Sequence, residues 1–283
     1  MATRRLLKHS SNAVSTGALV TFDIPSFDTI CQMGLTFTNS GAPATLANIK
    51  SSVSKITVLI NGEQVLNASA SDLANVWDSL GTQVAGSLVN SIPLMLGHLL
   101  YKLPEAEDTI GDIGCERYAQ GQKVSNIQIQ VQFGTVTSID LVQAYTERVN
   151  KGTGRNVTNA ILKLLTYAET GSVGPNEVPN LPKDADMGRL FTLCEPVGST
   201  VISKGEALLN NDPVIQDADL ATNAMLVQQR GFAQPTGCFL YSFTDGGMQD
   251  LLSMKDATDF RLRTTLTTAG SYTLVDATVR VVN

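Results

Sequence analysis

The residues that most often do chemistry are scarce in this chain. Its 283 residues include only two histidines, His9 and His98. A metal site on a β-barrel, as in the two-domain cupins, needs clustered histidines and a carboxylate, whereas the two histidines lie far apart in the first half of the chain and the second half has none. The sequence also lacks a His-Glu-x-x-His pair, a Gly-x-Ser-x-Gly nucleophile turn and a Gly-x-x-x-x-Gly-Lys phosphate loop. We therefore expect no catalytic, cofactor-binding or metal-binding residue, and we predict that the protein is not an enzyme.

Carboxylates are the remaining candidates for a site. Asp184 and Asp186, or Asp108 and Asp112, could share a calcium ion, because hard cations take oxygen ligands from loops. The alternative is that these loops are merely solvated. A glycosidase would need two acids facing each other across a cleft, and nothing in the sequence selects one pair of acids above the others. Calcium in these loops is thus an open alternative to the expectation of no cofactor.

Composition favours an assembling protein of two domains. Hydrophobic residues make up 43 % of the chain and charged residues 16 %, against roughly 25 % charged residues in typical soluble proteins. Neutral polar side chains or neighbouring subunits must then cover part of the surface. The net charge of −6 opposes a general nucleic-acid-binding surface. A chain of 283 residues exceeds the size at which one core usually stops growing, so two domains of about 140 residues are expected.

The N-terminus is an exception to the acidic balance. Arg4, Arg5 and Lys8 lie beside Leu6 and Leu7. This segment could touch an anionic membrane or a packaged genome, or it could be a solvated, partly ordered tail. The basic start runs into polar residues instead of the apolar core of a signal peptide.

The chain has four cysteines, Cys31, Cys115, Cys194 and Cys238, and they form no Cys-x-x-Cys pair. This spacing predicts buried free thiols and synthesis in a reducing cytoplasm.

A β pattern in the middle of the chain returns near its end. Ile127 to Phe133 alternates apolar and polar residues and is followed, after a turn, by Ile139 to Val149. Phe260 to Leu266 is followed in the same way by Tyr272 to Val282. The pattern predicts two tandem copies of one β unit. A shift of 133 residues, from 127 to 260, places Phe260 on Ile127, Leu262 on Ile129, Leu266 on Phe133, Leu274-Val275 on Leu141-Val142 and Ala277 on Ala144 without a gap.

The first half contains a clear hairpin followed by a helix. Val53 to Ile60 alternates, Asn61-Gly62 provides a turn with positive φ, and Glu63 to Leu66 returns. Ser69 and Asp72 are spaced as a capping pair, and the apolar spacing that follows places Trp77 in the core of a helix that ends at Gly81. Strands are also predicted over Ala18 to Ile24, Met33 to Thr38 and Ser91 to Leu96.

The second half repeats this order less clearly. We expect strands over Gly188 to Cys194 and Cys238 to Phe243, and a helix over Ile215 to Gln229. A candidate hairpin joins Thr200–Ser203 and Ala207–Leu209 around Lys204-Gly205. Val157 to Ala168 fits either a helix or the first strand of a second sandwich, and Thr170 to Met187 is predicted to be a long loop. Each half then ends in a final antiparallel pair.

These patterns predict an all-β protein. The expected fold is two tandem eight-stranded antiparallel jelly-roll β-sandwiches with short accessory helices. The expected domains are an N-terminal tail (1–16), a first jelly roll (17–150), a linker (151–156) and a second jelly roll (157–283).

Three segments carry a resemblance to a known family. They are the strand, Asn-Gly turn, return strand and helix of Val53 to Asp72, the Asn180-Leu-Pro-Lys loop that enters Arg189 to Cys194, and Phe243-Thr-Asp-Gly-Gly leading to Asp259–Leu262. The chain resembles the double jelly-roll major capsid proteins of icosahedral viruses, the group of tectiviruses, corticoviruses and the adenovirus hexon. It is most similar to the small corticovirus-type capsid proteins of bacterial viruses. The hairpin around Lys204-Gly205 departs from the Asn-Gly form of the first.

The resemblance implies a structural function in the virion. The protein would be a major capsid protein that forms homotrimeric, pseudo-hexagonal capsomers and contacts neighbouring capsomers and minor capsid or vertex proteins. The basic tail with Arg4, Arg5 and Lys8 would face an internal membrane or the genome, while 170–187 and 245–257 would be outer or interfacial. The alternative function is a carbohydrate-binding or adhesion β-sandwich, which would need exposed aromatic residues, yet aromatic residues make up 6 % of the chain.

Overall fold

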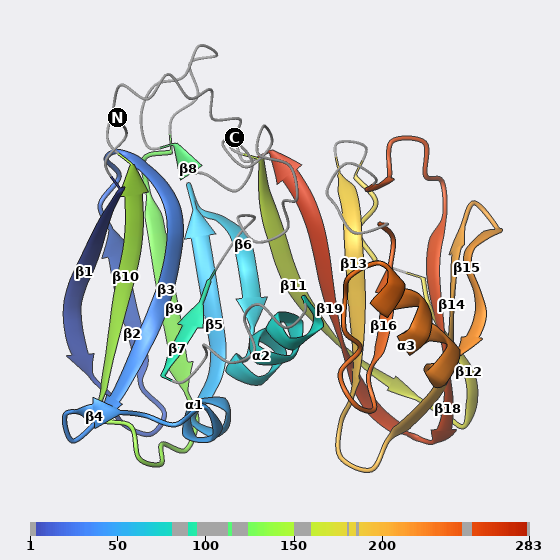
Figure 1. The fold of residues 1–283 in the computed structure, drawn as a ribbon, viewed down its shortest axis with the longest axis horizontal. Helices are drawn as coiled ribbons and strands as arrows, with labels where there is room; N and C mark the ends of the chain where they lie inside the picture. Colours follow the sequence, from blue (N-terminus) through green and yellow to red (C-terminus); the bar gives the residue numbers. More distant parts are fainter. Residues whose placement is uncertain are drawn as a thin grey trace. The chain divides into compact units, whose positions relative to one another are not determined.

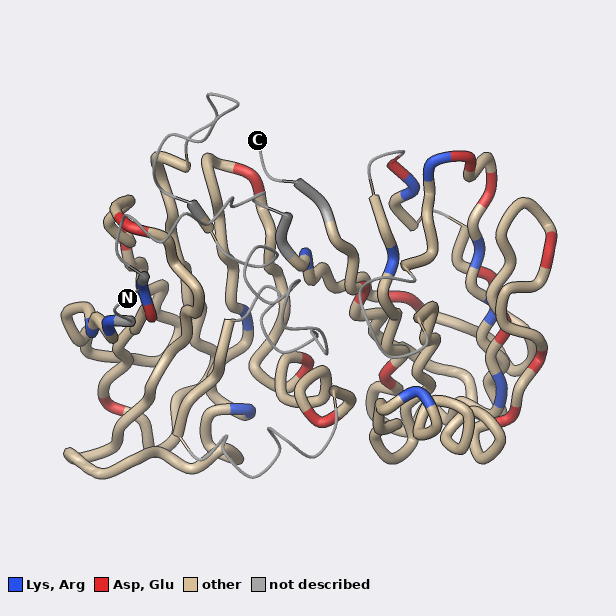
Figure 2. The backbone as a smooth tube through the Cα atoms, turned by 45° about the horizontal axis from the view of Figure 1, so that its top comes forward, with Lys and Arg blue, Asp and Glu red and all other residues tan. Residues whose placement is uncertain are grey.

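The computed structural model describes residues 4–80, 90–94, 113–114, 124–149, 160–179, 181–184, 187–244 and 251–281. Most of these residues lie in antiparallel strands (Figure 1). The chain divides into two compact units. The first comprises Met1–Ala74, Gly86–Lys163 and Val281–Asn283, and the second comprises Asn75–Ala85 and Leu164–Arg280. Figure 2 shows long stretches of both units without a charged residue, in keeping with the low charged fraction of the sequence.

Two sheets form the first unit. One contains β1 (Arg4–Ala13), β10 (Leu141–Val149), β3 (Thr29–Asn39) and β4 (Ala42–Pro43) in that order, and β7 (Ser91–Pro93) and β8 (Ile113–Gly114) also pair with β3. The other has the order β6 (Glu63–Ala68), β5 (Val53–Ile60), β9 (Ile127–Phe133), β2 (Leu19–Ile24). The alternation of β9 buries its apolar residues, and the ring of Phe133 meets that of Phe37 on β3 edge-on at 6.5 Å.

The second unit also has two sheets. In one, β16 (Phe239–Ser242), β13 (Gly188–Pro196), β19 (Gly270–Val281) and β11 (Ala160–Gly171) follow one another, and β17 (Leu252–Ser253) also pairs with β13. The other is a four-stranded sheet with the order β12 (Gly174–Val178), β18 (Phe260–Thr268), β14 (Val201–Leu209), β15 (Asp212–Asp219). Aromatic rings fill the core of this unit, where Phe239 and Tyr241 lie 4.6 Å apart.

The two units have the same strand order. The order β1-β10-β3 of the first unit corresponds to β11-β19-β13 of the second, and β2-β9-β5-β6 corresponds to β12-β18-β14-β15. This arrangement is the jelly roll, and the predicted fold class is confirmed. The last two strands of each unit were predicted to pair with each other, and this prediction is wrong. In the first unit, β9 pairs with β2 and β5, whereas β10 pairs with β1 and β3. The last two strands of each unit thus belong to opposite sheets, which is how a jelly roll closes.

Short helices accompany the strands. In α2 (Ala70–Ser79), Ser69 and Asp72 exchange the predicted capping hydrogen bonds of 2.9 and 3.1 Å, and Trp77 is buried. α3 (Leu220–Gln229) begins five residues later than predicted, because Asp219 caps it by accepting a 2.8 Å hydrogen bond from the Thr222 amide. α1 (Leu46–Ser52) was not predicted from the sequence. No helix in the described ranges is long and apolar enough to cross a membrane.

Several predicted elements of the second half differ from the structure. Lys204-Gly205 is no turn, because β14 continues through it and the chain reverses at Asn210-Asn211, whose φ angles are 51° and 69°. Of the two alternatives for Val157 to Ala168, the strand is correct from Ala160 onward. The predicted loop Thr170 to Met187 contains the short strand β12.

The N-terminal segment differs from the tail expected over residues 1–16. Arg4–Ala13 is the edge strand β1, which pairs with β10 from Arg4 opposite Val149 to Ala13 opposite Leu141. A bulge between Lys8 and Ser11 interrupts the register. The expected linker 151–156 lies outside the described residues. The boundary between the compact units falls within β11, between Lys163 and Leu164.

Candidate assembly surfaces

The described residues with reactive side chains are dispersed. His9 lies on β1 with Nε2 3.3 Å from Thr146 Oγ1, and burial together with the positive charge of Arg148 lowers its pKa. Cys31, Cys194 and Cys238 are buried free thiols, and burial raises the pKa of Cys194 far above its ordinary value. His98 and Cys115 lie outside the described residues. The structure therefore brings none of the described histidines and cysteines together as a nucleophile and its base.

The carboxylates considered for calcium are only partly described. Asp184 lies in the segment before β13, whereas Asp186, Asp108 and Asp112 lie outside the described residues. In the part of the chain that the structure describes, no group of three His, Cys, Asp or Glu side chains could hold a metal ion.

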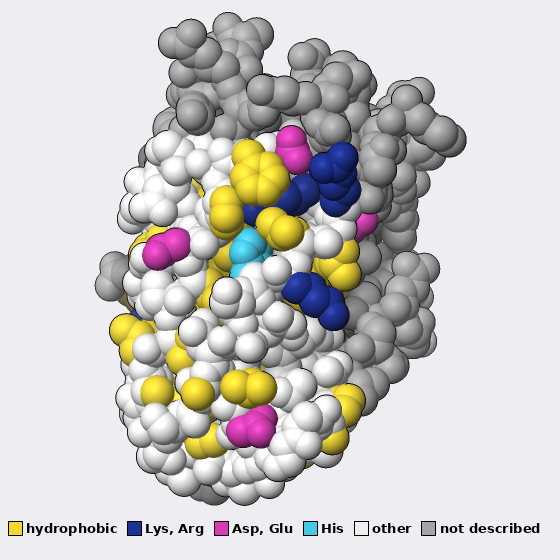
Figure 3. Space-filling model, turned by 90° about the vertical axis from the view of Figure 1, so that its left-hand side faces the viewer, with side chains coloured by type: hydrophobic (Ala, Val, Ile, Leu, Met, Phe, Trp, Pro, Cys, Tyr) yellow, Lys and Arg dark blue, Asp and Glu magenta, His cyan; other side chains and the backbone are white. Residues whose placement is uncertain are grey.

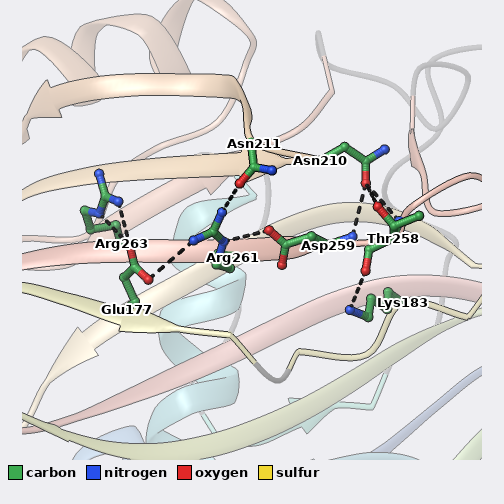
Figure 4. A network of polar contacts seen from close by, with 8 residues as sticks. All are labelled: Glu177, Lys183, Asn210, Asn211, Thr258, Asp259, Arg261 and Arg263. Carbon is green, nitrogen blue, oxygen red and sulfur yellow. Dashed lines mark hydrogen bonds and ion pairs between the residues drawn. The ribbon is translucent and has the colours of Figure 1, made fainter.

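A network of ion pairs covers the exposed face of the four-stranded sheet (Figure 4). Arg263 on β18 donates two hydrogen bonds to Glu177 of β12, of 3.1 and 2.6 Å, and one of 2.5 Å to Glu206 of β14. The hydrogen bonds from Arg263 lower the pKa of Glu177. Arg261 forms a 2.7 Å ion pair with Asp259 and also bonds to Asn211. The network connects three strands through side chains on one face of the sheet.

An asparagine at each hairpin turn connects that turn to a distant strand. Asn210 accepts hydrogen bonds at Oδ1 from the amides of Thr258 and Asp259, at 2.8 and 3.1 Å, just before β18. Asn61 accepts them from the amides of Ser125 and Asn126, at 2.9 and 3.2 Å, just before β9. Asn61 and Asn210 have the same backbone φ angle of 51°. The donors Ser125-Asn126 and Thr258-Asp259 are related by the 133-residue shift found in the sequence.

The duplication therefore extends to single hydrogen bonds. The backbone amide of each asparagine also donates a hydrogen bond of 2.8 Å in the opposite direction. Asn61 donates to the carbonyl of Asn126, and Asn210 donates to the carbonyl of Asp259. The Asn61-Gly62 pair predicted the first turn, whereas the second turn was not predicted at its position. The signal that could have found it was the Asn210-Asn211 pair, because asparagine tolerates positive φ better than other non-glycine residues.

The edge of the first unit at β1 combines apolar and basic side chains. Leu6 is 63 % exposed and Phe27, between β2 and β3, is 46 % exposed. The guanidinium carbon of Arg148 lies 4.3 Å from the centre of the Phe27 ring. The predicted basic residues Arg5 and Lys8 are exposed on the same strand as Leu6. Figure 3 shows this face, where hydrophobic and basic side chains and a histidine lie next to one another. The predicted basic segment is thus part of a sheet edge, with Arg4 at the start of the strand.

One charged pair is fully enclosed in the second unit. Arg189 on β13 forms an ion pair with Asp276 on β19, and its guanidinium carbon lies 4.4 Å from the centre of the Phe260 ring. It also donates a 2.6 Å hydrogen bond to the carbonyl of Pro182. Thr192 donates a 2.8 Å hydrogen bond to Asp276. The hydrogen bond from Arg189 to Pro182 holds the segment before β13 against the core, so the charged pair stabilises the fold.

Two jelly rolls in tandem define the double jelly-roll class of proteins. Comparison with known proteins agrees with this class. Residues 161–282 match the family model described as viral coat protein P2 C-terminal domain. No curated protein matches the chain.

Solved structures similar to this chain include major capsid proteins of viruses. The major capsid protein P2 from bacteriophage PM2 is 13 % identical, with a TM-score of 0.81, 99 % of this chain and 98 % of that chain covered. The Faustovirus major capsid protein is 7 % identical, with a TM-score of 0.69 and coverage of 99 % and 90 %. A chain of Sulfolobus turreted icosahedral virus is 12 % identical, with a TM-score of 0.68 and coverage of 98 % and 91 %. The chain has the fold of the double jelly-roll major capsid proteins, and the resemblance found in the sequence is confirmed.

Proposed function

We propose that the protein is a major capsid protein of an icosahedral virus. The observation that carries the proposal is the similarity to the bacteriophage PM2 major capsid protein over 99 % of this chain, with a TM-score of 0.81. The match of residues 161–282 to a viral coat protein domain supports it independently of the whole-chain fold. The location of the protein is then the shell of the virion.

The capsomer is a homotrimer. Two jelly rolls per chain and three chains per trimer place six similar units around one axis, which lets a threefold oligomer fill a hexagonal lattice. The repeated strand order and the matching asparagine turns make the units similar enough for this use. Neighbouring capsomers and minor capsid or vertex proteins are the further partners.

The edge at β1 faces an anionic partner inside the shell, either a membrane or the packaged genome. Exposed Arg5 and Lys8 beside exposed Leu6 support this role, because basic and apolar side chains together suit a lipid surface. Synthesis occurs in the host cytoplasm, which agrees with the buried free thiols Cys31, Cys194 and Cys238.

Light scattering coupled to size-exclusion chromatography tests the proposal. We expect a particle of about three times the 30.1 kDa chain mass, and hexagonal arrays or closed shells in electron micrographs of concentrated protein. A stable monomer that forms no array and binds immobilised glycans would contradict the capsid function and favour an adhesion protein.

A further inference from the structure

The hairpin turn between β5 and β6 contains the single Asn-Gly pair of the sequence, Asn61-Gly62. The backbone nitrogen that follows an asparagine can attack the side-chain carbon Cγ of that asparagine, because the two atoms close a five-membered ring. Glycine makes this attack easiest, since it has no side chain to shield its nitrogen. Asn61 and Gly62 are both exposed, and beyond the adjacent residues no described atom lies within 4 Å of the position that a Cβ on Gly62 would occupy. The turn therefore carries a chemically reactive pair.

The reaction is a deamidation and needs only water. A bond forms between the nitrogen of Gly62 and Cγ of Asn61, and the bond from Cγ to Nδ2 breaks. The proton lost by the attacking nitrogen leaves with Nδ2 as ammonia. The cyclic imide that remains takes up one water molecule and opens to aspartate or to isoaspartate. Neither product returns to asparagine, so each conversion is permanent.

Three hydrogen bonds hold the side chain of Asn61 away from this reaction. Its Oδ1 accepts from the amides of Ser125 and Asn126, at 2.9 and 3.2 Å, and from the Ser125 hydroxyl at 3.3 Å. We call these three bonds the Asn61 clamp. Both turn residues have positive φ, 51° and 83°, as in a type I′ turn. In such a turn, Cβ of the first residue and the nitrogen of the second lie on opposite sides of the Cα–C bond. The imide ring thus requires Asn61 to leave both the clamp and the turn conformation.

The second unit has an equivalent clamp without the reactive pair. Asn210 accepts hydrogen bonds from the amides of Thr258 and Asp259 in the same way, but the next residue is Asn211. The side chain of Asn211 bonds to Arg261. The hydrogen-bond pattern is therefore independent of the glycine. Beside an Asn-Gly pair it has a chemical consequence that it lacks in the second unit.

We propose that Asn61-Gly62 is a deamidation site that the Asn61 clamp keeps closed in the folded protein. Conversion then marks chains in which the β5–β6 hairpin has separated from the start of β9, an opening of the kind that native proteins undergo locally. Aspartate keeps the backbone length, and its carboxylate can accept the same amide hydrogen bonds. Isoaspartate adds a methylene group to the backbone of a two-residue loop, between the paired residues Ile60 and Glu63, so the hairpin cannot close in its original register. The proposal does not depend on the capsid function.

The clamp sets the size of the expected effect. A hydrogen bond inside a protein typically favours the bonded state by about fivefold, so the two backbone bonds to Oδ1 together favour it by about 25-fold. An asparagine in the same kind of turn without a clamp should convert faster by about this factor.

The β3–β4 turn, Ser40-Gly41, provides the matched position. Like Asn61-Gly62, it is an exposed two-residue loop, here between the paired residues Asn39 and Ala42, and its φ angles are 51° and 80°. The Ser40 amide donates a 2.6 Å hydrogen bond to Asp140, and the amide of Asn61 likewise donates to an acceptor across the sheet. Ser40→Asn therefore places an Asn-Gly pair in the same backbone conformation without the Asn61 clamp.

Peptide mapping by mass spectrometry of the purified Ser40→Asn protein, after incubation at neutral pH, measures both turns in one sample. In the folded protein we expect the introduced asparagine to convert about 25-fold faster than Asn61. In urea that unfolds the chain, both should convert at similar rates, because both precede glycine. Equal rates in the folded protein, or a faster conversion of Asn61, would overturn the proposal, since the turn conformation alone would then decide the rate.

A second variant moves the reactive pair to the other clamp. Asn211→Gly places glycine after Asn210, whose Oδ1 keeps its hydrogen bonds from the amides of Thr258 and Asp259. We expect Asn210 in this variant to be as resistant as Asn61 in the folded protein and to convert readily in urea. Circular dichroism checks that both variants are folded. Conversion of Asn210 in the folded protein at the rate of the asparagine introduced by Ser40→Asn would contradict the protective role of the clamp.

Discussion

Asn61 and Asn210 each fix a turn and the start of a remote strand with one side chain. Both residues have φ of 51°, a left-handed conformation that costs most side chains roughly 1 kcal/mol or more. Each carboxamide oxygen accepts two backbone hydrogen bonds from residues far along the chain. The turn and the strand therefore depend on each other, and a small change at the turn reaches the core.

Replacing Asn210 tests this dependence. Asn210→Ala removes the acceptor of two backbone amides and places a less tolerant residue at positive φ, so we expect a loss of about 2–3 kcal/mol in the free energy of unfolding. Asn210→Gly keeps the turn geometry and removes only the side-chain hydrogen bonds, so its loss should be smaller. Urea unfolding followed by circular dichroism measures both, and equal losses would show that backbone strain contributes nothing.

The enclosed pair Arg189–Asp276 makes a second residue-scale prediction. Asp276→Ala leaves the guanidinium buried without its charge partner, which typically costs about 3–5 kcal/mol. The double variant Arg189→Met with Asp276→Leu removes both charges and should recover much of that stability. Denaturant titration of the three proteins checks this. A double variant as unstable as the single one would mean that shape, and not the unpaired charge, decides the loss.

Glu177 provides a prediction on pH. Hydrogen bonds from Arg263 lower the pKa of Glu177 below its ordinary value of 4.5. The folded state thus favours the charged form, so the contribution of Glu177 to stability is complete above about pH 5 and is lost as the pH falls through the lowered pKa. Urea midpoints measured from pH 6 to pH 3 should decline more steeply for the wild-type protein than for Glu177→Gln. Parallel curves would contradict this role.

At the scale of elements, the sequence predicted strands, turns and helix caps correctly where the local preference of the residues agrees with the fold. The alternating strands β5 and β9, the Asn61-Gly62 turn and the cap of α2 were all predicted, because period, turn residue and capping pair each point to the same structure. The second hairpin was missed because Gly205 suggested a turn. A Cβ at Gly205 would lie 2.5 Å from Cε1 of Phe239, so this glycine serves close packing inside a strand.

The surfaces were harder to predict than the elements. The basic residues near the N-terminus were identified from composition, but their place on β1 depends on pairing with β10, more than 130 positions away in the chain. The network around Arg263 joins three strands from different parts of the second unit. Contacts of this kind arise only after the sheets have formed, and no local spacing encodes them.

The strand β1 carries its own prediction. Arg5→Glu with Lys8→Glu reverses two exposed charges without changing the backbone pairing of β1. We expect weaker binding to vesicles containing phosphatidylserine, since each basic residue near an anionic surface contributes about 1 kcal/mol. Lys204→Glu, an exposed change on β14 of the second unit, is the control. Sedimentation with vesicles and, separately, with double-stranded DNA distinguishes a membrane from a genome as the partner. Unchanged binding to both would contradict the proposed role of this edge.

At the scale of the whole molecule, duplication gives one chain two versions of the same module. The modules keep the strand order and the asparagine turns, and they differ in their outer surfaces. The first carries a basic and apolar edge, and the second carries a charged network and an uncharged helix. The proposed pseudo-hexagonal capsomer would use this combination, because alternate positions around its axis would meet different neighbours.

The assignment of Asn75–Ala85 to the second compact unit has a practical consequence for dissecting the protein. A fragment that starts at residue 164 would lack this stretch and expose the surface around Glu195 that accepts the hydrogen bond from Asn75. Such a fragment should aggregate when produced alone. Co-expression with residues 1–163, which supply the missing helical turns, should rescue its solubility, so the two pieces would act as a complementing split protein.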